Sequence, residues 1–179
     1  AVINKDISDC LEVTEFCNKN NINLLHCTRY NGESRVDYEK RLLTLINYNS
    51  NLFMFIGWNF VVTNYFIRNS PMIINLHPAL PGTFIGNNAV AQALDAYKRG
   101  EITYTGSMIH HVIEEVDKGE VIKSIKVLIN ENDTLQRLTE RIKYFEKGLV
   151  VSVLQNFVIE HINKQLTKDK SPYIGKVRK

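Results

Sequence analysis

Several features of secreted and membrane proteins are absent from this sequence. Its 179 residues include three cysteines, an odd number without CxxC spacing, which argues against a disulfide framework. No apolar run approaches the ~18–20 residues of a membrane helix, because the longest, residues 51–60, has the length of a strand. The first residues do not resemble a signal or transit peptide. We therefore expect a protein of a reducing, cytoplasmic compartment that does not associate with membranes.

Most of the chain also has no strong excess of either acidic or basic residues. The formal net charge is +3, but residues 164–179 hold six Lys/Arg and one Asp, a local charge of +5, which leaves −2 for residues 1–163. The basic stretch has no nucleic-acid motif and no regular interleaving of basic and aromatic residues, so a solvated C-terminal tail is expected and a nucleic-acid partner is not. We therefore divide the chain into a domain at 1–163 and a basic tail at 164–179.

What is present has the composition of one globular domain, with 44% hydrophobic and 23% charged residues. The hydrophobic period alternates between that of strands and that of helices. Strands are predicted at 1–3, 23–27, 52–56, 73–77, 105–112 and 121–128, and helices at 9–18, 36–48, 89–98 and from 134 onward. This alternation predicts an α/β fold with a doubly wound, mainly parallel sheet and helices on both faces.

The apolar spacing also predicts which surfaces are buried. The unbroken apolar run at 52–56 is typical of a strand that is covered on both faces. The helix from Thr134 has apolar residues at every third or fourth position, and Asp133 is well placed to cap it. In the helix at 36–48, one face is formed by Tyr38, Leu42, Leu45 and Ile46.

The strand at 73–77 carries the first candidate site residues. Residues two apart on a strand point to the same side, so Asn75 and His77 would face one cavity at the carboxyl end of the strand. An amide donor beside an imidazole is suited to holding and protonating an oxyanion that develops at a carbonyl. A structural histidine beside a turn asparagine is the alternative interpretation of this pair.

The second candidate segment runs from Met108 to Gly119 and contains an acidic loop. His110 and His111 alternate in direction, so one of them can point into a shared cleft. An aspartate such as Asp117 near His77 would favour the imidazolium and make it a usable acid near neutral pH. Glu114 and Glu115 are also compatible with an acidic surface turn. A metal site from His77, His110 and Asp117 is not expected, because the spacing matches no metal-binding motif.

Taken together, the motifs resemble one known family. These are N-L-H-P-A-L-P-G at 75–82, T-G-S-M-I-H-H-V-I-E-E-V-D-K-G at 105–119, and E-R-I-K-Y-F-E at 140–146. The segment F-I-G-W-N-F-V-V-T at 55–63 also falls where that family has a comparable turn. The sequence is similar to the folate-dependent formyltransferases, and within them to the phosphoribosylglycinamide formyltransferases, from Ala1 to about Gln155.

The resemblance implies transfer of a formyl group from 10-formyltetrahydrofolate to the primary amine of glycinamide ribonucleotide, in purine biosynthesis and without a metal. By similarity, Asn75 would donate to the oxyanion, His77 would donate a proton, and Asp117 would support His77 and order a water. His110 and Gly119 would support this site. The state of assembly is left between monomer and homodimer.

The resemblance also implies two sets of binding residues. Substrate contacts would come from Lys143 and Glu146. Folate contacts would come from Arg35, Asn59, Phe60, Val61, Val62, Asn75, Ile113, Glu114, Glu115, Val116 and Asp117. A guanidinium such as Arg35 suits the glutamate carboxylates of folate. The sequence departs from the family at Asn59-Phe60, where Met-Arg is common, and at Lys147, where His is usual.

The family's first strand and its small glycine-containing phosphate loop are not found near Ala1. The start at Ala1 instead of Met favours loss of a preceding segment; if the loop is truly absent, another amine acceptor is expected. Other interpretations within the superfamily are a sugar-nucleotide N-formyltransferase and a formyltetrahydrofolate hydrolase. A methionyl-tRNA formyltransferase is disfavoured, because no second domain fits in this length. A non-catalytic domain that retains the folate pocket is the alternative outside the enzymes.

Overall fold

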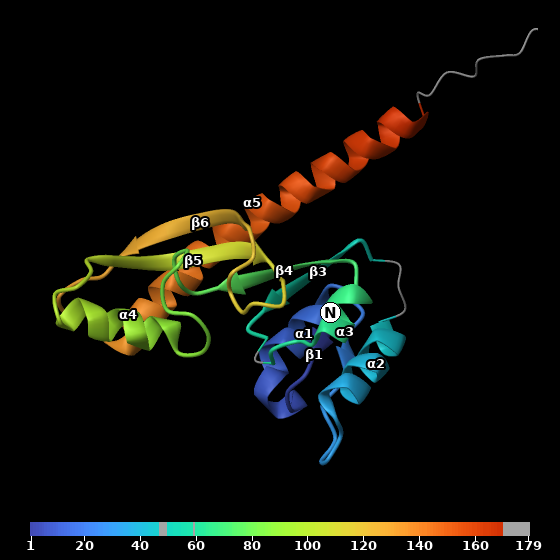
Figure 1. Cartoon of the computed structure of the whole chain (residues 1–179), viewed down its shortest axis with the longest axis horizontal. Coiled ribbons are helices and arrows are strands. Elements are labelled where there is room, and N and C mark those ends of the chain that lie inside the picture. The colour runs from blue at the N-terminus through green and yellow to red at the C-terminus, as the bar shows by residue number, and fades with distance from the viewer. Residues whose placement is uncertain (47–49, 59, 170–179) are drawn as a thin grey trace, which may run out of the picture.

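The computed structural model describes residues 1–46, 50–58 and 60–169. Its elements follow in the order β1 (Val2–Ile3), η1 (Ile7–Cys10), α1 (Leu11–Lys19), β2 (Leu25–His26), α2 (Arg35–Ile46), β3 (Leu52–Ile56), α3 (Asn64–Arg68), β4 (Met72–His77), α4 (Ala89–Lys98), β5 (Tyr104–His111), β6 (Val121–Leu128) and α5 (Leu135–Asp169). Figure 1 shows α1 to α3 gathered beside β1 and β3, with α4 next to β5. In the described residues no helix is long and apolar enough to cross a membrane.

The strands form a two-stranded sheet, β1-β2, and a four-stranded sheet in the order β3-β4-β5-β6. β1 and β2 are parallel, as are β3 and β4, whereas β4-β5 and β5-β6 are antiparallel. The predicted α/β class is therefore confirmed, but the larger sheet is mixed and not mainly parallel. β6 pairs antiparallel with β5 because the connection between them, residues 112–120, is short and contains no helix, whereas a parallel pair needs a longer crossover.

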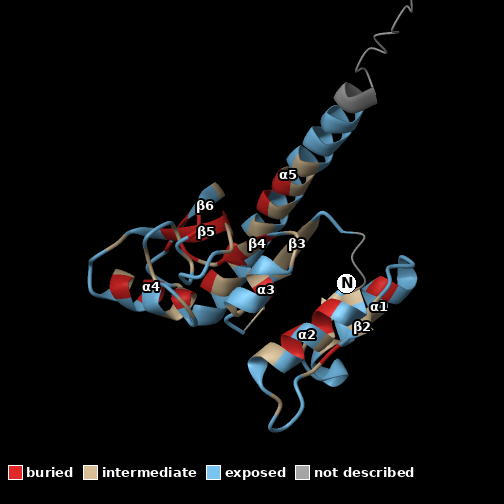
Figure 2. Ribbon diagram, turned by 45° about the vertical axis from the view of Figure 1, so that its right-hand side comes forward, coloured by how far each residue is buried: buried red, intermediate tan, exposed pale blue. Residues whose placement is uncertain are grey.

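Helices cover both faces of the larger sheet, as predicted. On one face, Ile73 of β4 packs with Tyr38 and Leu42 of α2 and with Phe66 of α3. On the other face, Leu149 and Val153 of α5 pack against a group of sheet residues, namely Ile74, Leu76 and Ile109. Near the far end of the sheet, α4 and the first turns of α5 form a further apolar cluster with Val127. Figure 2 shows buried residues along the sheet and along the faces of α4 and α5 that cover it.

Several local predictions need correction. On α2, Tyr38 and Leu42 are buried as predicted, whereas Leu45 is 45% exposed and Leu43, which was not predicted, is buried. β3 has one partner strand in the described part of the chain and is only partly buried, because it forms an edge there. The short helix α3 was not predicted.

The start and the end of α5 also differ from expectation. The Thr134 hydroxyl, not Asp133, accepts a hydrogen bond from the Arg137 N–H in the first turn of α5. Asp133 instead accepts the Asn130 N–H and binds the Arg141 guanidinium, at 2.7 Å from Nη1. These contacts keep the pKa of the Asp133 carboxyl below its ordinary value, and the Arg141 side chain is the largest cause. Residues 164–169 of the predicted tail continue α5, and 170–179 lie outside the described residues.

We predict that Gly106→Ala destabilises the protein. A Cβ at position 106 would lie 1.9 Å from the Ile125 carbonyl oxygen and 2.8 Å from Leu80 Cδ2, so β5 or β6 must shift. Overpacking of this kind costs about 1–3 kcal/mol. Thermal and urea unfolding would measure the loss.

Gly148→Ala on α5 is the matched control for this variant. No described atom lies within 4 Å of a Cβ built there, so alanine should stabilise the helix by up to ~1 kcal/mol. Equal stabilities for the two variants would contradict the close packing of β5 on β6.

Candidate active site

A cavity of about 320 Å³ lies at the carboxyl end of β4, on the sheet face that α2 and α3 cover. Its size falls within the range of small-molecule sites, about 300–1,000 Å³. The lining comprises residues from the end of β3 and the turn after it, from β4, from the loop before α4, and from β5 and the loop after it. These include Phe55, Trp58, Phe60, Val61, Val62, Asn75, His77, Gly86, His110, Val112, Ile113, Glu115, Val116 and Asp117.

The polar end of the cavity is built from paired strands. Asn75 and His77 lie two residues apart on β4, and Asn75 pairs in register with His110 of β5, so all three side chains are on one face. Asn75 Nδ2 is 3.3 Å from His110 Nε2, and His110 Nδ1 is 2.8 Å from the His111 carbonyl oxygen. The carbonyl can only accept, so Nδ1 carries a proton, and Nε2 points toward the Asn75 amide. Of the two adjacent histidines, His110 is therefore the one that faces the cleft.

Asp117 joins these side chains from the loop after β5. Its carboxylate lies 3.5 Å from His77 Nδ1 and 3.5 Å from His110 Nε2, and it accepts the Gly86 N–H at 2.8 Å. Burial raises the pKa of the Asp117 carboxyl, but the hydrogen bonds from His110 and Gly86 and the two nearby imidazoles outweigh it and leave the pKa below its ordinary value. Asp117 has a φ of +56°, a region that aspartate tolerates better than most residues.

His77 is held at both ring nitrogens. Nδ1 faces Asp117, and Nε2 lies 3.0 Å from the carbonyl oxygen of Phe84, whose φ is +44°. Both neighbours are acceptors, so a ring protonated at both nitrogens satisfies both contacts. The His77 side chain is 6% exposed, which makes these contacts largely free of competing water.

Gly119 supports the loop that carries Asp117. A Cβ at this position would lie 1.7 Å from the His111 carbonyl oxygen, so no other residue fits without moving β5 or β6. The His111 N–H also donates to the Glu120 carbonyl at 2.9 Å. The close approach fixes residues 112–120 against the end of β5.

Most of the predicted folate residues line the cavity. Phe60, Val61 and Val62 line it, and the Arg35 guanidinium donates to the Val61 carbonyl at 2.8 Å from beside the wall. Asn59 lies outside the described residues. Of the loop after β5, Ile113, Glu115, Val116 and Asp117 line the cavity, whereas Glu114 pairs with Arg68 at 3.6 Å.

The predicted substrate residues lie on the other side of the sheet. Glu146 accepts the Ser107 hydroxyl at 2.7 Å, and Ser107 is on the face that packs against α5. Ser107 is next to Met108, which pairs in register with His77 at the end of β4. Glu146, which binds Ser107, is therefore level with the end of β4, but it does not line the cavity. Lys143 is exposed on α5. The structure therefore brings together the predicted catalytic residues and most of the predicted folate residues, and leaves Glu114 and the substrate pair outside that cavity.

Sequence reasoning missed three contributors to the site. Phe84 and Gly86 act through their backbone atoms, for which the residue type gives little signal. Trp58 stacks on Phe55, with ring centroids 5.1 Å apart and planes at 14°, and adds a flat aromatic surface to the wall. The run of aromatic residues at 53–60 was the available signal for it.

This arrangement combines an aromatic wall with amide and imidazole donors that surround a buried carboxylate. It can bind a flat heterocycle and can donate hydrogen bonds or a proton to a carbonyl oxygen at its polar end. No group of three or more potential ligands in the described residues could hold a metal ion. The fold and the site thus define an α/β protein with a ligand-sized cleft equipped for acid and oxyanion chemistry.

Comparison with known proteins places this arrangement in a family. The family described as formyl transferase matches residues 7–154, so the chain belongs to the formyl transferase family. It is 41% identical over 131 residues to the phosphoribosylglycinamide formyltransferase of Dictyostelium discoideum, covering 68% of this chain and 64% of that protein. It is 34% identical over 121 residues to the enzyme of the same name from Schizosaccharomyces pombe, covering 65% and 58%.

The fold agrees with these similarities. The crystal structure of the phosphoribosylglycinamide formyltransferase from Streptococcus pneumoniae TIGR4 superposes with a TM-score of 0.75 at 27% identity, over 82% of this chain and 80% of that one. The corresponding structure from Bacillus halodurans gives a TM-score of 0.73 at 27% identity, over 83% and 74%. The chain spans less than two thirds of the length of each of these two curated relatives.

We predict that the wild type loses stability relative to Asp117→Asn as the pH falls. The folded-state pKa of Asp117 is lowered, so its stabilising contribution is present above about pH 4, the pKa in the unfolded chain, and is lost as the pH falls through the folded pKa. Asparagine keeps the shape, tolerates a positive φ, and does not titrate.

Urea unfolding of both proteins between about pH 6 and pH 3 would measure the difference. Parallel curves over this range would contradict a carboxylate held charged by His110, Gly86 and His77.

Proposed function

We propose that this chain transfers a formyl group from 10-formyltetrahydrofolate to the amine of glycinamide ribonucleotide, a step of purine biosynthesis in the cytoplasm. The observation that carries the proposal is the cluster of Asn75, His77 and Asp117 at the polar end of a cavity with an aromatic wall. The family and the names of the relatives support the same reaction.

The reaction would begin when the amine nitrogen attacks the formyl carbon. The carbonyl electrons move to the oxygen, and Asn75 and His77 donate hydrogen bonds to the oxyanion. One Asn75 N–H faces His110 Nε2, which leaves the second for the oxyanion. His77 Nε2 contacts the Phe84 carbonyl in this structure, so the substrate oxygen would replace that carbonyl as the acceptor.

Collapse of the tetrahedral intermediate then breaks the bond between the formyl carbon and N10 of the folate. The amine loses one proton, N10 gains one, and the products are a formamide and tetrahydrofolate. The buried Asp117 carboxylate stabilises the positive charge on His77 until His77 gives a proton to N10, and the proton that the amine loses restores that charge. His110 lies beside both Asn75 and Asp117. In this mechanism His77 is the proton donor, and Asp117 orients it.

The cavity chemistry fits the folate co-substrate. Its planar pterin would lie against the wall formed by Phe55, Trp58 and Val61, with its polar edges toward the backbone at 113–116. The exposed Arg35 guanidinium has five donors, one of which reaches Val61, so others suit the glutamate carboxylates of folate. Glu115 and Val116 would complete the loop side of the pocket.

The ribonucleotide would reach the site from the end of β4. Glu146, held by Ser107, is level with that end and would hold the ribose or the amine, and Lys143 would lie toward the phosphate. These two assignments rest on the resemblance to the family more than on contacts with the cavity.

Consumption of 10-formyltetrahydrofolate, followed by absorbance with and without glycinamide ribonucleotide, tests the proposal. Consumption that requires the ribonucleotide supports the transferase, and consumption without it indicates a hydrolase. Folate binding with no turnover would overturn the proposed reaction and indicate a binding domain.

We predict that Asn75→Ala lowers kcat by ~10²–10³, the usual effect of losing one oxyanion donor. The change removes the amide that faces both His110 and the reacting oxygen. Steady-state turnover with both substrates would measure the loss. Asn20→Ala is the matched control, since that exposed side chain contacts the Phe16 carbonyl at the end of α1. Turnover of Asn75→Ala like that of the control would remove Asn75 from the mechanism.

A further inference from the structure

Helix α2 contacts one wall of the cavity at three successive points. We call residues 60–63 the wall segment. The Arg35 guanidinium donates to the Val61 carbonyl at 2.8 Å, and the Tyr38 ring meets the Phe60 ring edge-on with centroids 6.0 Å apart. The third contact is made by Glu39, which is 2% exposed although it lies on a helix rich in charge.

The Glu39 carboxylate binds Thr63 through two hydrogen bonds. It accepts the Thr63 N–H at 2.8 Å and also accepts the Thr63 hydroxyl. The same hydroxyl accepts the Phe66 N–H at 3.4 Å and so caps α3. Hydrogen bonds to a charged acceptor in a buried site are strong and directional, so Glu39 fixes both the backbone of Thr63 and the start of α3.

We propose that Glu39 is a positioning residue for the folate co-substrate. By fixing Thr63, its carboxylate holds the wall segment in the conformation that presents Phe60, Val61 and Val62 to the cavity. This inference rests on the proposed function, because it assigns folate to that wall. Glu39 does not itself line the cavity, so its effect passes through the wall segment.

Glu39→Gln is the first variant that tests this role. The glutamine oxygen can accept one of the two Thr63 donors, and the amide NH₂ then opposes the other. The expected result is a Kd for tetrahydrofolate about tenfold to a hundredfold weaker, the scale of one lost hydrogen bond to a charged group. The KM for 10-formyltetrahydrofolate should rise by the same factor, with kcat and the KM for the ribonucleotide within about twofold of wild type.

Binding can be read without turnover. Trp58 is the one tryptophan of the chain, lines the cavity and stacks on Phe55, so its fluorescence reports occupancy of this cavity by added tetrahydrofolate. A wild-type chain whose Trp58 emission does not respond would overturn folate binding, and the positioning role with it. If the wild type responds and Glu39→Gln binds tetrahydrofolate with the same Kd, the positioning role alone would be overturned.

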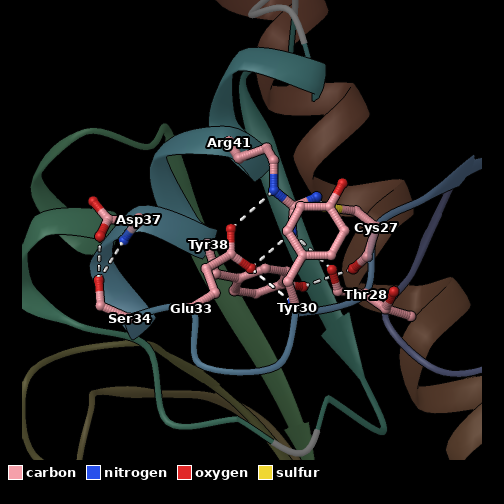
Figure 3. Close-up of polar contacts among 8 residues, drawn as sticks. All are labelled: Cys27, Thr28, Tyr30, Glu33, Ser34, Asp37, Tyr38 and Arg41. Carbon is pink, nitrogen blue, oxygen red and sulfur yellow. Dashed lines mark hydrogen bonds and ion pairs between the residues drawn. The ribbon is translucent and has the colours of Figure 1, made fainter.

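Glu33→Gln is the matched control on the same side of the molecule. Glu33 binds Arg41 through two hydrogen bonds, from Nε at 3.0 Å and from Nη2 at 2.8 Å, and Figure 3 shows this pair beside Tyr30 and Cys27. The Arg41 side chain lowers the pKa of Glu33. The control removes the charge of a half-buried acceptor near α2 that makes no contact with the wall segment, so it should lower stability and leave the Kd for tetrahydrofolate unchanged. Equal weakening in both variants would indicate general loosening of α2 and would contradict a specific role for Glu39.

A second pair of variants keeps the test decisive if Glu39→Gln does not fold. Thr63→Val removes the hydroxyl that Glu39 accepts, and Thr63→Ser retains it. The valine variant should show the raised KM for 10-formyltetrahydrofolate, and the serine variant should restore the wild-type value. A serine variant as impaired as the valine variant, or a valine variant with unchanged KM, would overturn the proposal.

Discussion

The Asp117 carboxylate holds together three segments that are far apart in the sequence. His77 reaches it from the end of β4, His110 from β5, and the Gly86 N–H from the loop that leads to α4. A buried carboxylate is costly without partners, and here each partner also belongs to the cavity lining. Satisfying this one charge therefore fixes the positions of the groups that would carry out the chemistry.

The antiparallel pairing of β4 with β5 makes that arrangement possible. Asn75 lies opposite His110, and His77 lies opposite Met108, so the amide and both imidazoles emerge on the same face within two residues of each other along the strands. The other face of the same strands packs against α5. The sheet therefore separates the face that carries the cavity from the face that packs against α5, and Ser107 with Glu146 lies on the α5 side.

The bounds of several elements and part of the candidate site could be predicted from the sequence, for physical reasons. The bounds of β3, α4 and β6 were predicted as observed, because apolar period and turn residues mark them clearly. The same-face placement of Asn75 and His77 follows from the two-residue period of any strand. The proximity of Asp117 was expected only through the resemblance, since its loop position has no periodic signal.

The remaining features depend on tertiary contacts. The buried face of α2 includes Glu39, which a charge-rich helix sequence conceals, although its spacing from Leu42 and Leu43 places it on the apolar side. α3 is only five residues long, too short for a helical period to be visible. In the mixed sheet β5 lies beside β4, and α4 and the first turns of α5 pack near its far end, a long-range arrangement that the pattern of any one strand does not encode.

The proposed reaction requires the reacting nitrogen of the folate to lie at the polar end of this cavity. A crystal structure of the chain with tetrahydrofolate tests this requirement most directly. We expect the pterin against Phe55 and Trp58, with N10 within hydrogen-bond reach of Asn75 or His77. Folate bound elsewhere, or with N10 remote from both side chains, would contradict it.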